Sequence, residues 1–444
     1  MSHWKEYKLG EIADINKKTI GKGYNFEIIE YVDTSSVTEN AFDNPQVIPL
    51  AEAPSRAKRL VNEGDTIIST VRPIQKHYGY IKDAKPNTVV STGFAVVSPK
   101  AIDPKFLFYF LTQEEITIYL NTLAESGTTT FPAFRPDELV NLTISAPESI
   151  ADQTAIASIL SSLDEKIELN NAINRNLEAL AQALFKQWFV EFNFPVDDHG
   201  NFSPLSGEMS EGQRGYKDSG GEMVDSELGE IPKGWTISTF KEHLNVCRGL
   251  SYNGAGLTDK MNGVPMHNLN SVYEGGGYKF EGIKYYSGEF KERHILKPWD
   301  LIVTNTEQGH KFLLIGCPAF VPKYFGSQGI FSHHIYKVET KEDSYLNNQF
   351  VYYLMLHPSI REQIVGCTNG TTVNMLKISG LEVPMFKLPP QSLVTIFSEY
   401  VKSIWEKLEV SFEENHNLKK IRDTLLPKLI SGELEVKDIN TVSV

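Results

Sequence analysis

The feature that most constrains this 444-residue chain is an internal repeat. Short motifs from the first half recur in the second half in the same order, and their offset rises only from 231 to 243 residues. A steady offset with small insertions is typical of a tandem duplication. The matched pairs are Trp4 with Trp235, Asp65 with Asp300, Ser91 with Ser332, and the Gly-Thr-Thr turns at Gly127 and Gly370.

A long helical pattern follows each half of the repeat. Ser149 and Asp152 resemble a capping box at the start of the first helix. Apolar residues then recur at heptad positions a and d, which favours a coiled-coil seam. The first helix has Ile156, Leu163, Asn170, Leu177 and Leu184 at a, with Ile159, Lys166, Ile173, Leu180 and Gln187 at d. The second helix has Leu408 and Asn415 among its a positions and Ile404, Leu418 and Leu425 among its d positions.

Each predicted seam contains one asparagine near its middle, Asn170 in the first helix and Asn415 in the second. A buried asparagine at an a position costs stability and fixes the register of the partners. The alternative is that both residues lie at a wet edge of the pair. The helices are expected to pair antiparallel as a spacer related by a pseudo-twofold axis, or else to form a dimerisation stalk for an unrelated enzyme.

The pattern predicts an α+β protein with two globular modules of mixed α/β fold and two long helices. A segment with three basic and nine acidic residues between 192 and 234 is predicted to be a flexible or loosely ordered connector. The predicted segments are module 1 (1–148), spacer helix 1 (149–192), linker (193–234), module 2 (235–388), spacer helix 2 (389–432) and a C-terminal tail (433–444).

Composition and motifs argue against several functional classes. No apolar run approaches the length of a membrane span, and the N-terminus lacks the features of a signal peptide, so a cytoplasmic protein is expected. Three scattered cysteines suggest a reducing compartment. Phosphate-loop, dinucleotide, zinc-protease and nucleophile-elbow motifs are missing, so the chain is not expected to be an enzyme. His333 and His334 are expected to point to opposite faces of a strand and not to share a metal.

The best binding signal is a pair of polar loops at matching positions of the two modules. Cations interleaved with amides and aromatic residues suit a surface that neutralises phosphates and reads base edges. The alternative is that these are ordinary solvated loops. The candidate DNA-binding residues are Arg56, Lys58, Arg59, Arg72, Gln75, Lys76, His77 and Tyr78 in the first module, and Asn305, Gln308, His310 and Lys311 in the second.

The two Gly-Thr-Thr turns offer uncharged donors beside these loops. Backbone N–H groups and hydroxyls of this kind can grip a phosphate and set the register of a protein on DNA. Thr128 and Thr129 in the first module, and Thr371 and Thr372 in the second, are therefore added to the candidate DNA contacts.

Three segments resemble a known family. The helix "SSLDEKIELNNAINRNLEALAQALFKQWFVEF", the linker "SGGEMVDSELGEIPKGW" and the ending "LKKIRDTLLPKLISGELEV" are similar to the specificity subunit of bacterial type I restriction-modification systems. The resemblance implies two target-recognition domains, each reading half of a bipartite site in double-stranded DNA, and an antiparallel coiled coil.

The same resemblance implies partners for the chain. These are two methyltransferase subunits and a restriction subunit, which would use S-adenosylmethionine, ATP and magnesium, with no cofactor in this chain and no membrane contact. Partner subunits would also make the net charge of −13 tolerable for DNA binding. The alternatives are an unrecognised methyltransferase or nuclease with a coiled-coil stalk, and an interaction scaffold that does not touch DNA.

Overall fold

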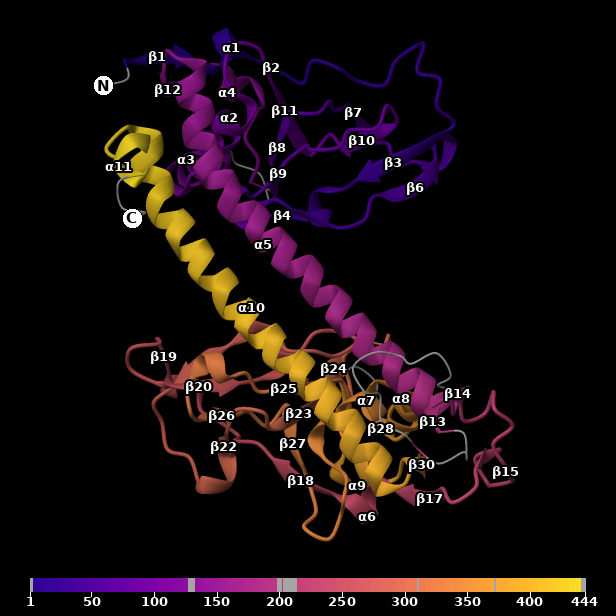
Figure 1. Cartoon of the computed structure of the whole chain (residues 1–444). Coiled ribbons are helices and arrows are strands. Elements are labelled where there is room, and N and C mark those ends of the chain that lie inside the picture. The colour runs from indigo at the N-terminus through magenta and orange to yellow at the C-terminus, as the bar shows by residue number, and fades with distance from the viewer. Residues whose placement is uncertain are drawn as a thin grey trace. The chain divides into compact units, whose positions relative to one another are not determined.

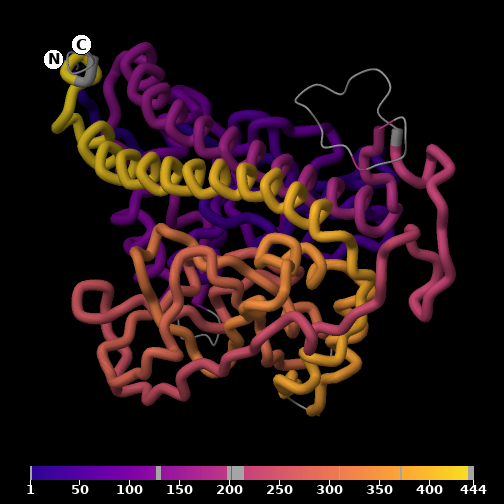
Figure 2. The backbone as a smooth tube through the Cα atoms, turned by 60° about the horizontal axis from the view of Figure 1, so that its bottom comes forward, coloured from indigo at the N-terminus to yellow at the C-terminus, as the bar shows by residue number. Residues whose placement is uncertain are grey.

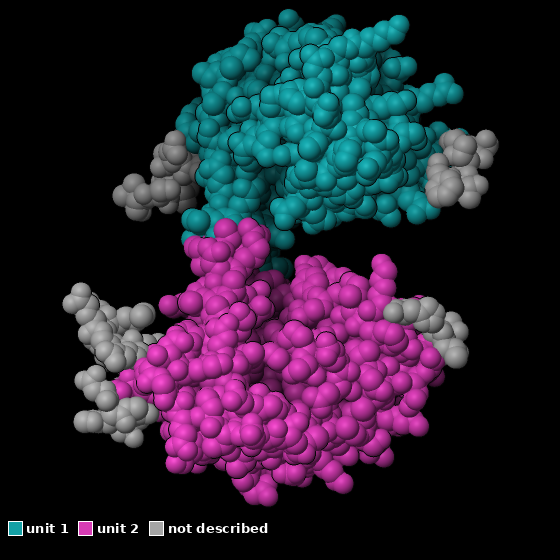
Figure 3. All heavy atoms as spheres, turned by 90° about the vertical axis from the view of Figure 1, so that its right-hand side faces the viewer, with its two compact units in different colours: residues 1–169, 415–444 teal, residues 170–414 magenta. Residues whose placement is uncertain are grey.

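The computed structural model describes residues 3–126, 132–197, 202, 214–309, 311–370 and 373–440. The chain divides into two compact units, residues 1–169 with 415–444 and residues 170–414 (Figure 3). Each unit holds one globular module and a part of each long helix. Each also has its own apolar core.

The module of the first unit is built from two four-stranded sheets (Figure 1). One contains β6 (Gln46–Pro49), β3 (Ile28–Val32), β10 (Thr88–Ser91) and β7 (Ala57–Leu60), and the other β2 (Ala13–Ile15), β11 (Phe94–Pro99), β8 (Thr66–Ser69) and β9 (Tyr78–Tyr80). The strand β1 (Trp4–Lys8) pairs with β12 (Thr143–Pro147), and β4 (Val37–Thr38) pairs with β5 (Ala41–Phe42). The helices are α1 (Leu9–Ile12), α2 (Pro104–Leu111), α3 (Glu114–Glu125) and α4 (Asp137–Val140).

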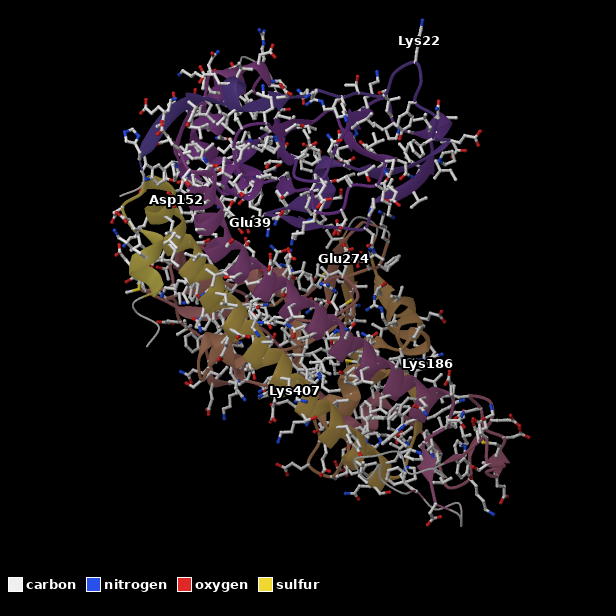
Figure 4. The ribbon with its side chains drawn as sticks, turned by 45° about the horizontal axis from the view of Figure 1, so that its top comes forward. Lys22, Glu39, Asp152, Lys186, Glu274 and Lys407 are labelled. Atoms are coloured by element: carbon white, nitrogen blue, oxygen red, sulfur yellow. The ribbon has the colours of Figure 1, made fainter. Side chains whose placement is uncertain are left out.

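Local sequence explains where these elements begin. Asp103 caps α2 by accepting the N–H of Phe106 at 2.9 Å, and Pro104 occupies the first helical position, where its missing N–H costs nothing. All four residues of β8 are buried, which fits a strand covered on both faces. Lys22 projects from the long loop between β2 and β3 (Figure 4).

The module of the second unit repeats this plan. Its sheets contain β18 (Leu244–Arg248), β27 (Ile335–Thr340), β23 (Leu301–Thr304) and β25 (Pro318–Phe320), and then β19 (Leu257–Thr258), β21 (Lys284–Tyr286), β20 (Val264–His267), β26 (Gly329–Phe331) and β22 (Ile295–Leu296). The strand β17 (Thr236–Thr239) pairs with β30 (Met385–Leu388), and a further sheet joins β24 (Thr306–Gln308), β29 (Val373–Leu376) and β28 (Thr368–Asn369). The helices are α6 (Phe240–His243), α7 (Asn348–Leu356), α8 (Pro358–Gly366) and α9 (Ile378–Glu382).

Strand order confirms the internal repeat predicted from the sequence. The order β2-β11-β8-β9 corresponds to β18-β27-β23-β25, and β6-β3-β10-β7 corresponds to β21-β20-β26-β22. Both of the latter sheets contain a parallel pair at the same place, β3 with β10 and β20 with β26. The second module adds β19 to its sheet.

Two long helices follow the modules, α5 (Ile150–Phe185) and α10 (Gln391–Ser431), and the short α11 (Val436–Asn440) ends the described chain (Figures 1 and 2). Inside the first unit, Asp164 of α5 contacts Arg422 of α10 at 2.8 Å. Inside the second unit, Asn170 contacts Glu414 at 2.7 Å, and the Phe185 ring lies 5.7 Å from the Phe397 ring. Residue numbers rise along one helix as they fall along the other, so the predicted antiparallel pairing is confirmed. No helix within the described ranges is both long and apolar enough to cross a membrane.

The seam of α5 differs from the predicted a and d positions. Its a positions do face inward, but Ile173 and Leu180 at d are 43% and 58% exposed. For four of the five a positions the buried companion lies four residues later, and these companions are Leu160, Ile167, Ala181 and, in the π-helical turn Lys186–Val190 that continues α5, Trp188. The reason is that each part of α5 packs on the module of its own unit as well as on α10, which widens the buried stripe beyond a coiled-coil seam. In α10 the a and d positions face inward as predicted, with Val401, Ile404 and Leu408 buried.

The two seam asparagines are buried, so the wet-edge alternative is wrong. Asn170 is 3% exposed and Asn415 is 7% exposed. The Asn170 amide donates to the Glu414 carboxylate at 2.7 Å. A buried amide needs such a partner, so the two helices are held in one register at this point.

The described part of the linker is packed, which corrects the prediction of a loose connector. Short strand pairs form here, β13 (Pro195–Val196) with β14 (Arg214–Gly215) and β15 (Met223–Val224) with β16 (Ile231–Pro232). Phe194 and Ile231 are buried in the same core as Trp188 and Trp235. Apolar side chains too sparse to form a periodic pattern therefore anchor the linker to the second module.

Candidate nucleic-acid interface

In the first module, three segments meet at the end of β8. The Thr70 N–H donates to the carbonyl of Gly93, in the turn between β10 and β11, at 2.8 Å. The Arg72 N–H donates to the Pro132 carbonyl, and the Phe134 N–H donates back to the Thr70 carbonyl, both at 3.0 Å. The polar loop after β8 is thereby joined to the segment that follows the first Gly-Thr-Thr turn.

The second module repeats this arrangement at the end of β23. The Asn305 N–H donates to the His334 carbonyl at 3.1 Å, and the Leu376 N–H donates to the Asn305 carbonyl at 2.9 Å. Thr306 then pairs with Met375 where β24 meets β29. The sequence singled out the loops and the turns separately, and the fold brings the segments beside them together. Thr128, Thr129, His310, Thr371 and Thr372 lie outside the described residues.

Arg72, Gln75 and Lys76 line a short turn after β8. Arg72 and Gln75 are exposed. Arg72 and Lys76 have left-handed backbones, with φ of 46° and 56°, which is uncommon for side chains of this kind and frequent at functional loops. Lys76 bonds Glu114 at 2.8 Å and lies 3.6 Å from Glu39. The Glu114 bond is the main cause that raises the pKa of Lys76, so its charge is retained but already partly matched.

The basic stretch on β7 separates into outward and inward residues. Lys58 is exposed, and Arg56 is exposed beside its partner Asp33. Arg59 instead donates to the Asn16 side chain and the Phe94 carbonyl, and burial lowers the pKa of its guanidinium. This side chain ties β7 to the start of β11 in the other sheet, which favours a structural role for Arg59, and its DNA contact stays a prediction.

His77 and Tyr78 are also held by the module. The His77 Nδ1 atom lies 2.6 Å from the Val37 carbonyl and 3.1 Å from the Thr38 hydroxyl. The Tyr78 ring packs edge-to-face on Phe108 at 6.3 Å, and burial raises the pKa of its hydroxyl. Both residues therefore support the loop after β8, and Tyr78 packs against the core while remaining partly exposed, so its DNA contact stays a prediction.

In the second module, Gln308 and Lys311 are exposed, whereas Asn305 is 1% exposed. The Asn305 amide donates to the His333 carbonyl at 3.0 Å, and its oxygen accepts from the Thr306 hydroxyl at 2.8 Å. Asn305 is therefore a scaffold residue, contrary to the sequence-based prediction. It fixes the turn between β26 and β27 against the start of β24.

Glu307 is a positioning residue that the sequence analysis missed. It is 7% exposed, and its carboxylate accepts the backbone N–H groups of Leu313, Leu314 and Ile315 at 2.8 to 2.9 Å. A carboxylate with three such donors is a strong anchor. It fixes the backbone at 313–315, where the loop that carries Gln308 and Lys311 ends. The available signal was an acidic residue three positions after the end of the apolar strand β23.

The histidine pair was also misjudged. His333 and His334 lie in the turn between β26 and β27 rather than in a strand, so their rings lie side by side with centroids 3.9 Å apart. The His334 Nδ1 atom lies 3.2 Å from the Thr306 hydroxyl, and burial lowers the pKa of His334. The described residues contain no group of three side chains suited to a metal. An uncharged His334 imidazole at this place suits hydrogen bonds to base edges better than phosphate contacts.

Comparison with known proteins supplies independent evidence. Residues 1–179 match the family model described as "Type I restriction modification DNA specificity domain". The chain is 27% identical over 98% of its length to the HindI specificity subunit of Haemophilus influenzae, covering all of that protein. It is 27% identical to the MjaIX specificity subunit of Methanocaldococcus jannaschii, covering 98% of this chain and 89% of that one. The fold is similar to that of a type I S subunit from M. genitalium, with a TM-score of 0.53, 15% identity and 96% of each chain covered.

Proposed function

We propose that this chain belongs to the type I restriction-modification specificity subunit family and that it is the non-catalytic subunit that recognises DNA, reading one half of a bipartite site with each module. One observation carries the assignment of the reading surface. The same three backbone segments meet at the end of β8 and of β23, while the side chains they present differ. A shared scaffold with different side chains is what two readers of two different half-sites require.

The chemistry of the two surfaces supports different base preferences. Arg72 and Gln75 of the first module carry donors that can form bidentate bonds in the major groove. Gln308, Lys311 and the histidine pair occupy the corresponding place in the second module. Lys58 and Arg56 lie on β7 and beside it, where they suit phosphate contacts.

Partner subunits supply what this chain lacks in the proposal. Two methyltransferase subunits and a restriction subunit would bind S-adenosylmethionine, ATP and magnesium. They would also add phosphate contacts that compensate for the net charge of −13. The complex would act in the cytoplasm, where the host DNA is found.

The exposed apolar residues of α5 give a place for a methyltransferase subunit to dock. Ile173 and Leu180 were predicted to face α10 but are open to solvent. Leu180→Glu should lower co-purification with the methyltransferase without changing the unfolding of the chain. Leu177→Glu is the matched control, because Leu177 packs against the core and a buried charge should destabilise the chain itself. Equal co-purification of Leu180→Glu and the wild type would exclude this surface.

The recognition assignment is tested by mapping methylated sites in cells that carry the complete complex. The double variant Arg72→Gln/Gln75→Ala should change or relax one half-site, and Gln308→Ala/Lys311→Gln should change only the other. Arg59→Lys serves as a control that should leave both half-sites as they are. If either double variant altered both half-sites equally, these loops would be general phosphate contacts and the assignment would fail.

We also propose that the two helices set the distance between the half-sites. An insertion near Trp188 or Phe189 would break the aromatic core, so the helices should be lengthened where both pass between the units, after Leu169 and after Glu414. Seven residues in each helix preserve the seam and add about 10 Å at about 1.5 Å per residue. At about 3.4 Å per base pair the unread gap should grow by about three base pairs. An unchanged gap with full methylation would show that the helices do not set the spacing.

A further inference from the structure

A cavity of about 160 Å³ lies wholly inside the unit formed by residues 170–414. Its walls come from the module and from both long helices. A second hollow of about 170 Å³ adjoins it and shares Glu178, Gly277, Tyr278 and Trp405. Six of the thirteen residues that line the first cavity are aromatic, and they are Tyr278, Phe280, Trp299, Phe320, Trp405 and Phe412.

The aromatic walls are held in place by one another. Trp405 lies edge-to-face against Phe320 at 4.9 Å, and its indole N–H donates to the Tyr353 hydroxyl at 3.0 Å. Phe280 stacks on Phe412 of α10. Because the Trp405 N–H already donates to Tyr353, it cannot donate to a ligand in the cavity. The aromatic rings therefore present only their faces and edges to a ligand.

The polar side of the cavity consists of acceptors. Asn174 and Glu178 lie one turn apart on α5, and both line the cavity. The Asn174 Oδ1 atom is buried without a hydrogen-bond partner. Glu178 stands at the solvent-exposed mouth, and none of the described residues forms a hydrogen bond or ion pair with it. Desolvation raises the pKa of the Glu178 carboxyl.

The other carboxylate of the cavity is already matched. Glu409 accepts the backbone N–H of Lys323 at 2.5 Å and lies 3.4 Å from the Lys323 ammonium. That ammonium also lies 5.3 Å from the centre of the Trp299 ring. The site thus already holds one cation against an indole and a carboxylate, while Glu178 and Asn174 are left without a donor.

We infer that this cavity binds an organic cation with N–H donors on a short apolar stem, that is, a primary ammonium or a guanidinium. Aromatic faces attract such a cation, the Glu178 carboxylate matches its charge, and the Asn174 oxygen accepts one of its N–H groups. A cavity of about 150 Å³ is known to hold a molecule the size of benzene, so a stem of about four carbons fits. The cation can come from a free amine or from a lysine or arginine side chain of a partner subunit.

The test is a titration of the full chain with n-butylammonium, followed by tryptophan fluorescence, since Trp299 and Trp405 line the cavity. Binding should be saturable, and n-butanol, which has the same stem without the charge, should bind far more weakly. Glu178→Gln should weaken binding at least about tenfold, as expected for loss of one charge-assisted contact. The matched control Glu406→Gln changes a carboxylate next to Trp405 that does not line the cavity, and it should bind as the wild type does.

Asn174→Asp adds a second negative charge to the cavity and should tighten binding of n-butylammonium. This gain keeps the test decisive even if Glu178→Gln folded poorly. Equal binding of n-butanol and n-butylammonium, or unchanged affinity in both cavity variants, would overturn the inference.

The two sources of the cation are separated by repeating the titration on the complex with the methyltransferase. If a partner side chain fills the cavity, the complex should not respond to n-butylammonium, and Glu178→Gln should weaken assembly. If the natural ligand is a free amine, the complex should bind n-butylammonium as the chain alone does.

Discussion

Arg422 provides the sharpest test of how the helices are joined in the first unit. This residue occupies a seam position of α10 where the heptad pattern would place an apolar side chain. Its guanidinium contacts Asp164 and Asp423, both at 2.8 Å, and the Tyr109 hydroxyl donates to Asp164 at 2.7 Å. Burial opposes the charge, but the attraction of Asp164 and Asp423 outweighs it and raises the pKa of Arg422.

Replacing Arg422 by methionine keeps the length of the side chain and removes its charge. Asp164, with a side chain only 15% exposed, would then have the Tyr109 hydroxyl as its remaining donor among the described residues. Breaking a fully buried pair costs about 3 to 5 kcal/mol, and partial exposure of this pair reduces the expected cost to about 2 to 3 kcal/mol. In the double variant Arg422→Met/Asp164→Asn the uncompensated charge is gone, so the coupling between the two changes should be about 1 to 2 kcal/mol.

Lys82 and Glu168 form the matched surface pair. Their charged atoms are as close, at 2.6 Å, but their side chains are 41% and 49% exposed. Lys82→Met should therefore cost less than about 1 kcal/mol. Hydrogen exchange of peptides from residues 150–169 measures local opening in this unit separately from the other. The proposed role of the pair would be refuted if Arg422→Met and Lys82→Met lowered the free energy of unfolding equally. It would also be refuted if the effects of Arg422→Met and Asp164→Asn were simply additive.

Three further predictions concern single residues. Glu307→Gln should speed hydrogen exchange at 313–315 and relax reading of the second half-site, because a neutral amide oxygen can replace only part of three charge-assisted bonds, and loss of each is worth about 1.5 to 3 kcal/mol. Burial lowers the pKa of His267 to about 3, so the stability contributed by the neutral ring is full above about pH 6.5 and falls as the pH drops towards 3. The free energy of unfolding measured in urea should therefore fall by about 2 kcal/mol between pH 7 and pH 5, and by less in His267→Gln. Substitutions of the neighbours Lys58 and Arg59 should have different effects. Lys58→Met should reduce the slope of log K against log salt for DNA binding by about one, with little change in the free energy of unfolding. Arg59→Met should lower the free energy of unfolding by about 1 to 2 kcal/mol, with the sequence preference retained. Equal exchange in Glu307→Gln, an identical pH dependence in His267→Gln, or the reverse order for Lys58 and Arg59 would contradict the respective assignments.

The sequence could predict the repeat, the two helices and their pairing because these depend on local order and on periodic burial. It placed the partners of the a positions in α5 one residue too early, since periodicity alone cannot reveal that a helix packs on two neighbours. It also assigned Arg59, Tyr78 and Asn305 to the DNA surface from residue type. Whether such a side chain faces solvent depends on contacts with distant residues, such as Asn16, Phe108 and His333, and no local pattern encodes these contacts.

The turn at the centre of each reading surface shows how one scaffold can carry two chemistries. In the first module the turn ends in Gly93, and a Cβ atom there would lie 2.8 Å from the Thr34 methyl group, so a larger side chain cannot be added without moving Thr34. In the second module His333 and His334 occupy the matching positions, and Asn305 holds their backbone from below. The backbone bonds at this turn are the same, so exchanging Thr92-Gly93 for His-His alone should strain the first module rather than transfer specificity. Transfer should also need a smaller residue at position 34, which makes the supporting shell, and not only the exposed side chains, a determinant of which bases each module reads.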